Sequence, residues 1–179
     1  EDYETKMSDI FSELHRVLEP GGVMTVMFTH KEADAWDTLT MSLINSGFTI
    51  TSTHPITSEI PQRVSQQGNA SADSTLLLTG RKRLEKSQNQ DNTPTLWSDV
   101  KSDTREAAKD AARDLLNSGL SLTKTDVIIS AYGPTLRVFA DSYPVVDDQD
   151  NTVPPRRALE EAREAVTRVL VDEYLVGDD

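Results

Sequence analysis

The sequence predicts an α/β protein in which a partial open sheet, residues 1–83, is followed by a small all-helical region. Three observations indicate this arrangement. The first half alternates helix-like and strand-like segments, the run at 23–29 (VMTVMFT) is apolar at nearly every position, and the second half keeps helical spacing of apolar residues. A strand that is apolar on both sides is typical of a central strand covered on both faces. Helix-strand-helix-strand order around such strands favours a mainly parallel sheet with right-handed crossovers.

The first region begins with two helices on either side of this strand. From Met7 to Leu18 the apolar residues recur at spacings of three and four, which is the pattern of one apolar helix face. The segment 19–22 (EPGG) ends this helix, because proline cannot continue it and glycine permits a sharp turn. Residues 33–46 return to helical spacing, and Gly47 is a suitable terminator.

The first region closes with two strands separated by a long polar loop. Residues 48–55 (FTITSTHP) alternate as in a half-buried strand, and 75–79 (TLLLT) form a short apolar strand. Because no helix lies between them, we expect these two strands to be antiparallel neighbours at a sheet edge. The intervening segment 57–73 is too long for a tight hairpin, which makes it a candidate for function.

The second region, 96–179, follows a polar linker at 84–95 and is predicted to be helical. We expect helices at 97–115 and 123–132, the second capped by Thr123 or Thr125 with Asp126 in its first turn. Gly133 and Pro134 are expected to break that helix and to start a short one, and a last helix begins near Pro155. Residues 144–153 read as a turn-rich acidic loop. We expect this half to pack as a satellite on the sheet region or on other parts of a larger protein.

Composition bounds the class of protein. The chain of 179 residues carries a net charge of −12, with eighteen Asp against twelve Glu and eleven Arg against seven Lys. Acidic excess with scarce lysine fits a hydrated surface in high salt, so we expect a salt-adapted cytoplasmic protein, the alternative being an ordinary acidic one. The absence of cysteine excludes disulfides and thiolate metal sites. No apolar run is long enough to span a bilayer, and the polar start is not a secretory signal. Because no Met precedes Met7, we expect the chain to be a fragment.

The run at 14–59 (LHRVLEPGGVMTVMFTHKEADAWDTLTMSLINSGFTITSTHPITSE) resembles the end of a class I, S-adenosylmethionine-dependent methyltransferase. In particular it resembles the archaeal and bacterial adenine-specific DNA methylases often described as containing a zinc ribbon. The segment 28–36 (FTHKEADAW) and the late strand ending in Arg-Lys-Arg carry most of this likeness, which continues through 130–146 (SAYGPTLRVFADSYPVV) and the final helix. The resemblance implies the C-terminal half of a Rossmann-like sheet, because class I methyltransferase sheets end in a reversed hairpin.

The chain departs from the family at the parts that bind cofactor and catalyse. The glycine-rich loop after the first strand has no counterpart, nor has the Asp/Asn-Pro-Pro-Tyr/Phe motif that holds a flipped target base. Residues 151–156 (NTVPPR) contain two prolines, but Val153 replaces the polar residue and Arg156 the aromatic one. The zinc ribbon is excluded by the missing cysteines. We therefore assign no catalytic, cofactor-binding or metal-binding residue to this chain, and expect S-adenosylmethionine to bind only to the intact parent.

Polar residues at the predicted carboxyl ends of the strands are the candidates for a substrate cleft. His30 and Lys31 follow the strand at 23–29, and ligands of open α/β sheets bind at this edge. The alternative is a polar loop beside a helix cap. Glu59, Arg63 and Ser74 lie in or beside the long loop, which is near the cleft in the resembled family. Arg63 is of the type that contacts nucleic-acid phosphates, and the alternative is a solvated loop.

Three further polar features each have a structural alternative. His54 ends a strand and is either a functional residue or an ordinary edge residue. The basic residues 81–83 are either a salt-sensitive phosphate contact or simply solvated. Asp147, Asp148 and Asp150 lack the glycine and distal glutamate of a calcium loop, which favours solvation.

The resemblance implies the C-terminal part of a DNA adenine-N6 methyltransferase, with DNA, the missing N-terminal part or other subunits as partners. No membrane or metal partner is expected. A second hypothesis is a non-catalytic interaction module, which predicts an exposed apolar surface where earlier strands should pack. A third is part of a small-molecule methyltransferase, because sheet-closing elements do not encode the substrate class.

Overall fold

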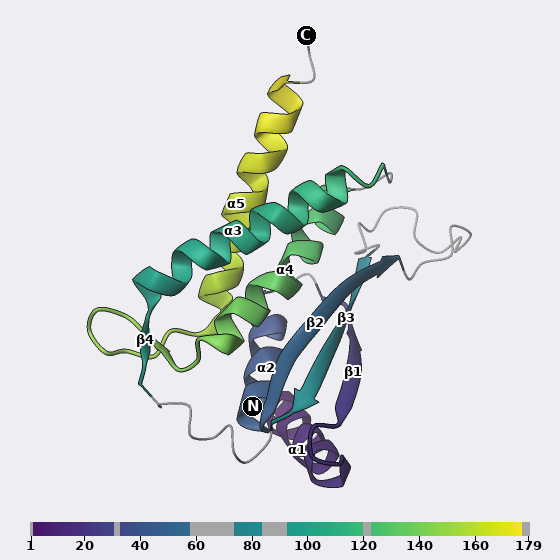
Figure 1. Ribbon diagram of the computed structural model, residues 1–179, viewed down its shortest axis with the longest axis vertical. Helices are drawn as coiled ribbons and strands as arrows, with labels where there is room; N and C mark the ends of the chain where they lie inside the picture. The colour runs from purple at the N-terminus through teal and green to yellow at the C-terminus, as the bar shows by residue number, and fades with distance from the viewer. Residues whose placement is uncertain (1, 31–32, 58–73, 84–92, 120–122, 177–179) are drawn as a thin grey trace.

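The computed structural model describes residues 2–30, 33–57, 74–83, 93–119 and 123–176, and shows a protein of mixed helix and sheet (Figure 1). The elements along the chain are α1 (Asp2–Val17), β1 (Val23–Phe28), α2 (Ala33–Asn45), β2 (Phe48–Thr57), β3 (Ser74–Lys82), β4 (Thr95–Leu96), α3 (Trp97–Leu116), α4 (Lys124–Asp141), β5 (Val145–Val146) and α5 (Pro155–Val176). The predicted order of helix, strand, helix, strand, strand in the first region is confirmed. Gly47 ends α2 with a positive φ of 83°, a conformation that glycine adopts without steric cost.

The three strands of the first region form one sheet in the order β1-β3-β2. β3 is antiparallel to both neighbours, with Phe28 facing Leu76 on one side and Phe48 facing Lys82 on the other. The predicted antiparallel pair at a sheet edge is therefore confirmed. β1 and β2 run in the same direction, so their carboxyl ends lie at the same end of the sheet.

Two expectations for this sheet are wrong in the described part of the chain. Neither of its ladders is parallel, and β1 is an edge strand rather than a central one. The exposure of β1 alternates: Val26 and its neighbours on one face pack on the core, whereas Val23 and Met27 on the other are 43% and 64% exposed. The apolar run predicts cover on both faces, and the described residues supply it on one only, where α2 and α4 lie (Figure 1).

One hydrophobic core joins the two predicted regions. Trp36 of α2 is fully buried and makes edge-on ring contacts with Phe28 of β1 and Tyr132 of α4, at centroid distances of 4.8 and 5.7 Å. The same cluster takes apolar side chains from both sides of the predicted linker; its buried members include Leu39, Leu43, Phe48, Ile50, Leu76, Leu78, Ile129, Leu136 and Leu159. Two smaller clusters pack α3, α4 and α5 together. Burial of these side chains is the main force that holds the helices against the sheet.

Helix α4 corrects a further expectation. Its start is as predicted, since Thr123 and Asp126 form a reciprocal capping box, but the helix continues through Gly133 and Pro134 to Asp141. Proline removes the hydrogen bond to the carbonyl four residues earlier, here that of Ser130. Burial on either side of the proline offsets this loss, because the helix face from residue 127 to residue 140 is largely buried. Tertiary packing thus overrides the local breaker signal.

The rest of the second region is helical with one small addition. Helices α3 and α5 are confirmed, but Thr95 at the end of the predicted linker belongs to β4. β4 pairs in parallel with β5, which lies inside the predicted acidic loop. Most of the linker, residues 84–92, lies outside the described residues. The first turn of α5 is tied to α2, since Asp37 accepts a hydrogen bond from the Arg156 backbone N–H at 2.9 Å.

Candidate functional site

The predicted substrate cleft corresponds to the end of the sheet at which β1 and β2 finish and β3 begins. His30, two residues beyond β1, is exposed, and its ring stacks on Phe28 at a centroid distance of 6.3 Å. Its backbone carbonyl accepts a hydrogen bond of 2.8 Å from the indole N–H of the buried Trp36. Directly beside it, the hydroxyls of Thr29 and Thr75 lie 2.5 Å apart and tie the end of β1 to the start of β3. These two contacts tie the backbone at His30 to this edge.

The structure brings two of the five predicted cleft residues to this edge. The backbone of Ser74 starts β3 opposite Thr57, at the same end as His30. Lys31, Glu59 and Arg63 lie outside the described residues. His54 does not end its strand as predicted, because β2 continues to Thr57. It pairs with Leu77, is exposed, and shares a 2.8 Å hydrogen bond with the Ser52 hydroxyl. This contact fits the structural interpretation of His54.

The glycines that precede β1 do not form a cofactor loop. Gly21 has a positive φ of 75°, and a Cβ on Gly22 would lie 2.8 Å from the Glu19 carbonyl oxygen. Both glycines serve a closed turn between α1 and β1, at the amino end of the strand. Glycine-rich nucleotide loops follow a strand and open toward the ligand at its carboxyl end. Gly21 and Gly22 therefore do not lie where a nucleotide-binding loop of an open sheet would lie.

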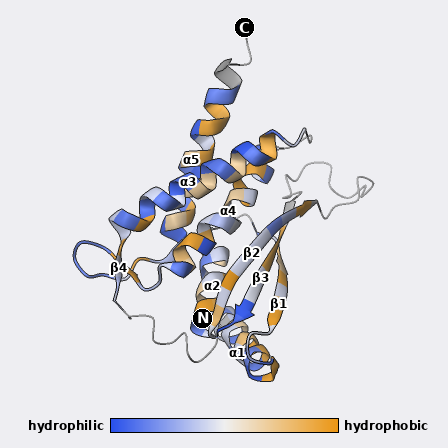
Figure 2. Ribbon diagram, in the orientation of Figure 1, coloured by the Kyte–Doolittle hydropathy of each residue, from blue (hydrophilic) through white to orange (hydrophobic). Residues whose placement is uncertain are grey.

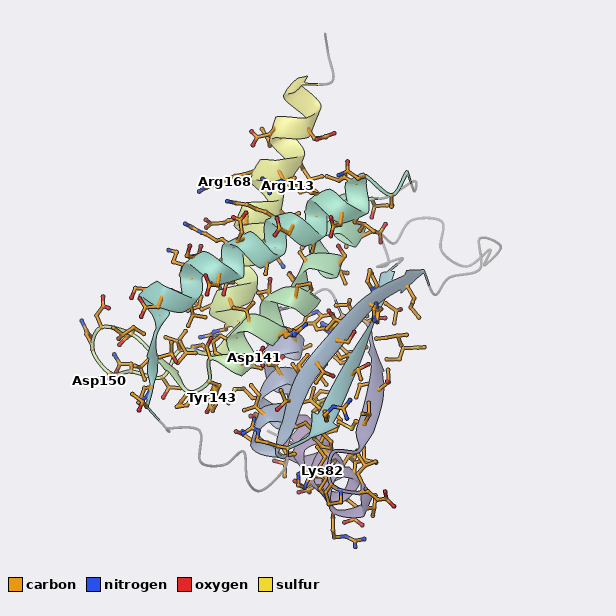
Figure 3. The ribbon with its side chains drawn as sticks, in the orientation of Figure 1. Lys82, Arg113, Asp141, Tyr143, Asp150 and Arg168 are labelled. Atoms are coloured by element: carbon orange, nitrogen blue, oxygen red, sulfur yellow. The ribbon has the colours of Figure 1, made fainter. Side chains whose placement is uncertain are left out.

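The basic cluster at 81–83 makes contacts within the chain. The Lys82 ammonium donates to the carbonyls of His15 and Leu18 at 2.5 and 2.7 Å, at the C-terminus of α1 (Figure 3). Arg81 donates to the Gly21 carbonyl at 2.8 Å, and Arg83 to the Thr49 hydroxyl at 3.4 Å. A cation near helix carbonyls is favourable because those groups have no partner within the helix. These contacts fit a structural role better than a phosphate contact.

His15 is a half-buried partner of this arrangement that sequence reasoning missed. Its ring packs edge-on against Phe48 at 5.3 Å, and a Cβ on Gly47 would lie 2.9 Å from its Nε2. Burial, together with the nearby Lys82 charge, lowers the pKa of His15 below its ordinary value of 6.5. The helical spacing of α1 places residue 15 beside the apolar face. Because histidine is polar, however, the apolar pattern of the sequence did not indicate that it packs against the sheet.

An apolar surface lies on α1 and β1. On α1, four exposed large apolar side chains lie on one face of the helix, at positions 3, 10, 14 and 17. Together with two side chains on the open face of β1 they define what we term the α1–β1 apolar surface: Tyr3, Ile10, Leu14, Val17, Val23 and Met27. Figure 2 shows hydrophobic residues on both elements. β1 has no strand partner on its other edge among the described residues.

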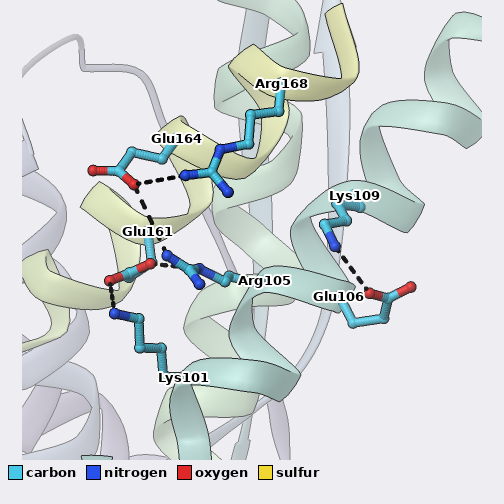
Figure 4. Close-up of polar contacts among 7 residues, drawn as sticks. All are labelled: Lys101, Arg105, Glu106, Lys109, Glu161, Glu164 and Arg168. Carbon is cyan, nitrogen blue, oxygen red and sulfur yellow. Dashed lines mark hydrogen bonds and ion pairs between the residues drawn. The ribbon is translucent and has the colours of Figure 1, made fainter. Parts of the chain in front are cut away.

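A charged network joins α3 to α5 (Figure 4). Glu161 accepts from Lys101 at 2.8 Å and from Arg105 at 2.6 Å, and its side chain is only 14% exposed. Burial by itself raises the pKa of Glu161, but the hydrogen bonds from both cations outweigh it and the pKa is lowered. Glu164 lies 3.9 Å from both Arg105 and Arg168. The cations on this face of α3 are thus matched by carboxylates, which indicates a structural network.

The acidic loop is organised by Asp147. Its carboxylate accepts from the backbone N–H groups of Gln149 and Asn151, both at 2.9 Å, and from the Asn151 side chain, and these bonds lower its pKa. Within the described ranges there is no group of three or more His, Cys, Asp or Glu side chains arranged to hold a metal ion. Among the helices that the structure describes, none is both long and apolar enough to cross a membrane.

No protein-family model, curated protein or solved structure matches this chain. The sheet end at His30 and Ser74 and the α1–β1 apolar surface are therefore the candidate functional features of the described residues.

Proposed function

We propose that this chain is the C-terminal part of an S-adenosylmethionine-dependent class I methyltransferase that acts on the N6 amino group of adenine in DNA. The observation that carries the proposal is the sheet itself. A reversed strand, β3, lies between two strands that share one direction, and β1, which has no second strand partner among the described residues, carries part of the α1–β1 apolar surface. A Rossmann-like sheet completed by earlier strands would use this edge of β1.

The exposed apolar side chains support the same proposal. Met27, Tyr3 and Ile10 are large hydrophobic side chains that are 64%, 60% and 59% exposed, and patches of such side chains mark surfaces that another part of a protein covers. The preceding strands and helices of the parent are the occupants that this proposal requires. Adenine as the target is supported by the sequence resemblance alone.

In the proposed protein this chain frames the substrate cleft. The carboxyl ends of β1 and β2 coincide, and ligands of open sheets bind there. His30 is held at this edge by its carbonyl contact to Trp36, with its ring exposed. It would contact the DNA, whereas the cofactor and the target base would be held by residues of the preceding part.

The proposal is tested with the chain extended upstream in its reading frame. The extension should encode a glycine-rich loop and an Asp/Asn-Pro-Pro-aromatic motif, and the extended protein should methylate adenine in DNA. An upstream frame without these motifs contradicts the methylase assignment. Methylation of small molecules but not of DNA would favour the third hypothesis.

Charge substitutions test the role of the α1–β1 apolar surface. Ile10→Arg and Met27→Arg should each lower activity of the extended protein roughly tenfold or more, because a guanidinium would have to be buried at an apolar interface. Val171→Arg is the matched control, since Val171 on α5 is also exposed, at 49%. Equal activity of all three variants would show that nothing covers this surface.

A non-catalytic interaction module is the second candidate, favoured by the same exposed surface. It predicts that the chain of 179 residues self-associates through α1 and β1, and that Met27→Arg prevents this. Size-exclusion chromatography at low and high salt measures it. A monomer under both conditions argues against the module and leaves the methyltransferase proposal standing.

A further inference from the structure

A groove lies between the outer edge of β2, the second half of α3 and the middle of α4. It consists of two adjoining cavities of about 490 and 470 Å³, both lined by Thr53, Ala107 and Pro134. Its position is separate from the sheet end at His30. Volumes of this size are typical of sites for small molecules.

The walls of the first cavity are mostly apolar. Pro55 of β2, Ala111 and Leu115 of α3, and Pro134 of α4 contribute to the first cavity. Pro55 has no N–H and therefore cannot donate to an added strand, and prolines of this kind protect sheet edges from pairing. The groove is thus better suited to a compact apolar body than to an extended peptide.

The polar groups of the first cavity are mainly hydrogen-bond acceptors. Ser130 and Pro134 both line it, and residue 134 has no N–H to donate to the Ser130 carbonyl. Across the cavity, Asp110 and Asp114 stand one turn apart on α3. Thr53 adds a hydroxyl. Two carboxylates and a carbonyl that lacks its helical N–H donor, in residues that line one partly apolar cavity, are acceptors that suit a cation.

The other charged groups at the groove, among the residues that the structure describes, leave this balance negative. Asp110 lies 3.3 Å from Arg113 on its own helix. In the second cavity Arg137 and Asp141 of α4 lie 3.8 Å apart and compensate each other; Figure 3 labels Asp141 at the end of α4. β2 contributes no charged side chain to the lining.

We propose that this groove binds a small organic cation that has one primary ammonium group and a compact apolar body. An ammonium carries three donors, which match the Ser130 carbonyl and the carboxylates of Asp110 and Asp114. The apolar body would fill the space beside Ala107 and Leu115. A neutral analogue lacks the attraction of the carboxylates, and an anionic one is repelled by them. The site does not depend on the methyltransferase proposal.

Titration with phenethylammonium, followed by amide chemical shifts, tests the proposal on the full chain. The neutral 2-phenylethanol and the anionic phenylacetate are the matched probes. We expect saturable shifts at residues of β2, α3 and α4, with the cation binding about fivefold or more tightly than the alcohol and less tightly as salt is raised. The absence of saturable binding up to about 10 mM, or equal binding of the alcohol, would overturn the proposal.

Two variants with the same change in charge separate the site from general electrostatics. Asp110→Asn with Asp114→Asn should weaken binding of the cation about fivefold to tenfold. Asp99→Asn with Asp103→Asn should leave it nearly unchanged, because these exposed residues are on the same helix but do not line the groove. Equal weakening by both pairs would show that only the net charge of the protein attracts the ligand. Circular dichroism and urea unfolding of each variant confirm that the fold is retained.

Discussion

The contact between α4 and β2 makes Gly133→Ala the most informative single substitution. A Cβ at residue 133 would overlap the hydroxyl oxygen and the Cβ of Thr53. Ordinary contact begins at 3.4 Å, so helix and strand would have to separate by about 1 Å or distort. That movement would loosen the core cluster to which both elements contribute.

The expected cost follows from two opposing effects. Overpacking of this kind costs about 2–3 kcal/mol. Replacing glycine by alanine within a helix returns about 1 kcal/mol, because alanine loses less backbone entropy. The free energy of unfolding should therefore fall by about 1–2 kcal/mol, and the Tm by roughly 2–8 °C for a chain of this size.

Urea unfolding followed by far-UV circular dichroism measures this change, and a double-mutant cycle assigns it. Thr53→Gly removes both clashing atoms, so Gly133→Ala should cost far less in that background, with a coupling of about 1 kcal/mol or more. An increase in stability for Gly133→Ala alone would refute the reasoning. It would mean that α4 does not pack against β2 at this point.

Three further substitutions test the polar contacts. Lys82→Met should lower the free energy of unfolding by about 1–3 kcal/mol in urea, and NMR titration should show the pKa of His15 rising toward 6.5. Because the lowered pKa of His15 makes its protonation oppose folding, the unsubstituted protein should lose stability as the pH drops below 6.5. An unchanged His15 pKa in Lys82→Met would contradict the contact. Glu161→Gln should lower the free energy of unfolding by about 1 kcal/mol at low salt and by less at high salt, whereas Glu160→Gln should leave it unchanged. Because the pKa of Glu161 is lowered from 4.5, the stabilisation by Glu161 is present above that pH and is lost as the pH falls through the lowered value. A loss of stability that does not depend on salt would argue against the ion pairs. Burial raises the pKa of Asp37 above 3.8, so the stability of the protein should fall as the pH rises through the raised pKa, and Asp37→Asn should reduce this fall. Asp37→Ala should lower the free energy of unfolding by about 1 kcal/mol, because the first turn of α5 loses its capping carboxylate. A titration midpoint of Asp37 at or below 3.8 would contradict the burial.

Local patterns in the sequence predict most of the secondary structure. The spacing of apolar residues places α1, α2, α3 and α5, and Gly47 ends α2 as expected. The missing helix between the last two strands correctly predicts the antiparallel β2–β3 pair. These features depend on residues close together in the chain, which is why they can be predicted from the sequence.

Features that depend on contacts between distant parts of the chain cannot be predicted from local sequence patterns. The continuity of α4 depends on burial and on the fit of Gly133 against Thr53, which lies eighty positions earlier, so Pro134 alone predicts a break that does not occur. The short β4–β5 pair likewise joins residues fifty apart. The composition of β1 predicts cover on both faces, and its open face is visible only in the structure.

The predicted site is readable in part for a similar reason. The carboxyl-end rule places His30 correctly beside the start of β3, because it depends only on strand direction. The contacts of Lys82 with the end of α1 join residues more than sixty apart, and the acceptors of the groove come from three separate elements. Nothing in the local sequence indicates either.

Calorimetric titration with S-adenosylmethionine, on this chain and on the chain extended upstream, tests the central claim most directly. The sheet with its free β1 edge and its glycines in a closed turn predicts no tight binding by residues 1–179. It predicts micromolar binding by the extended protein, in which the earlier strands supply the cofactor loop. Micromolar binding by residues 1–179 alone, or none by the extended protein, would contradict the account.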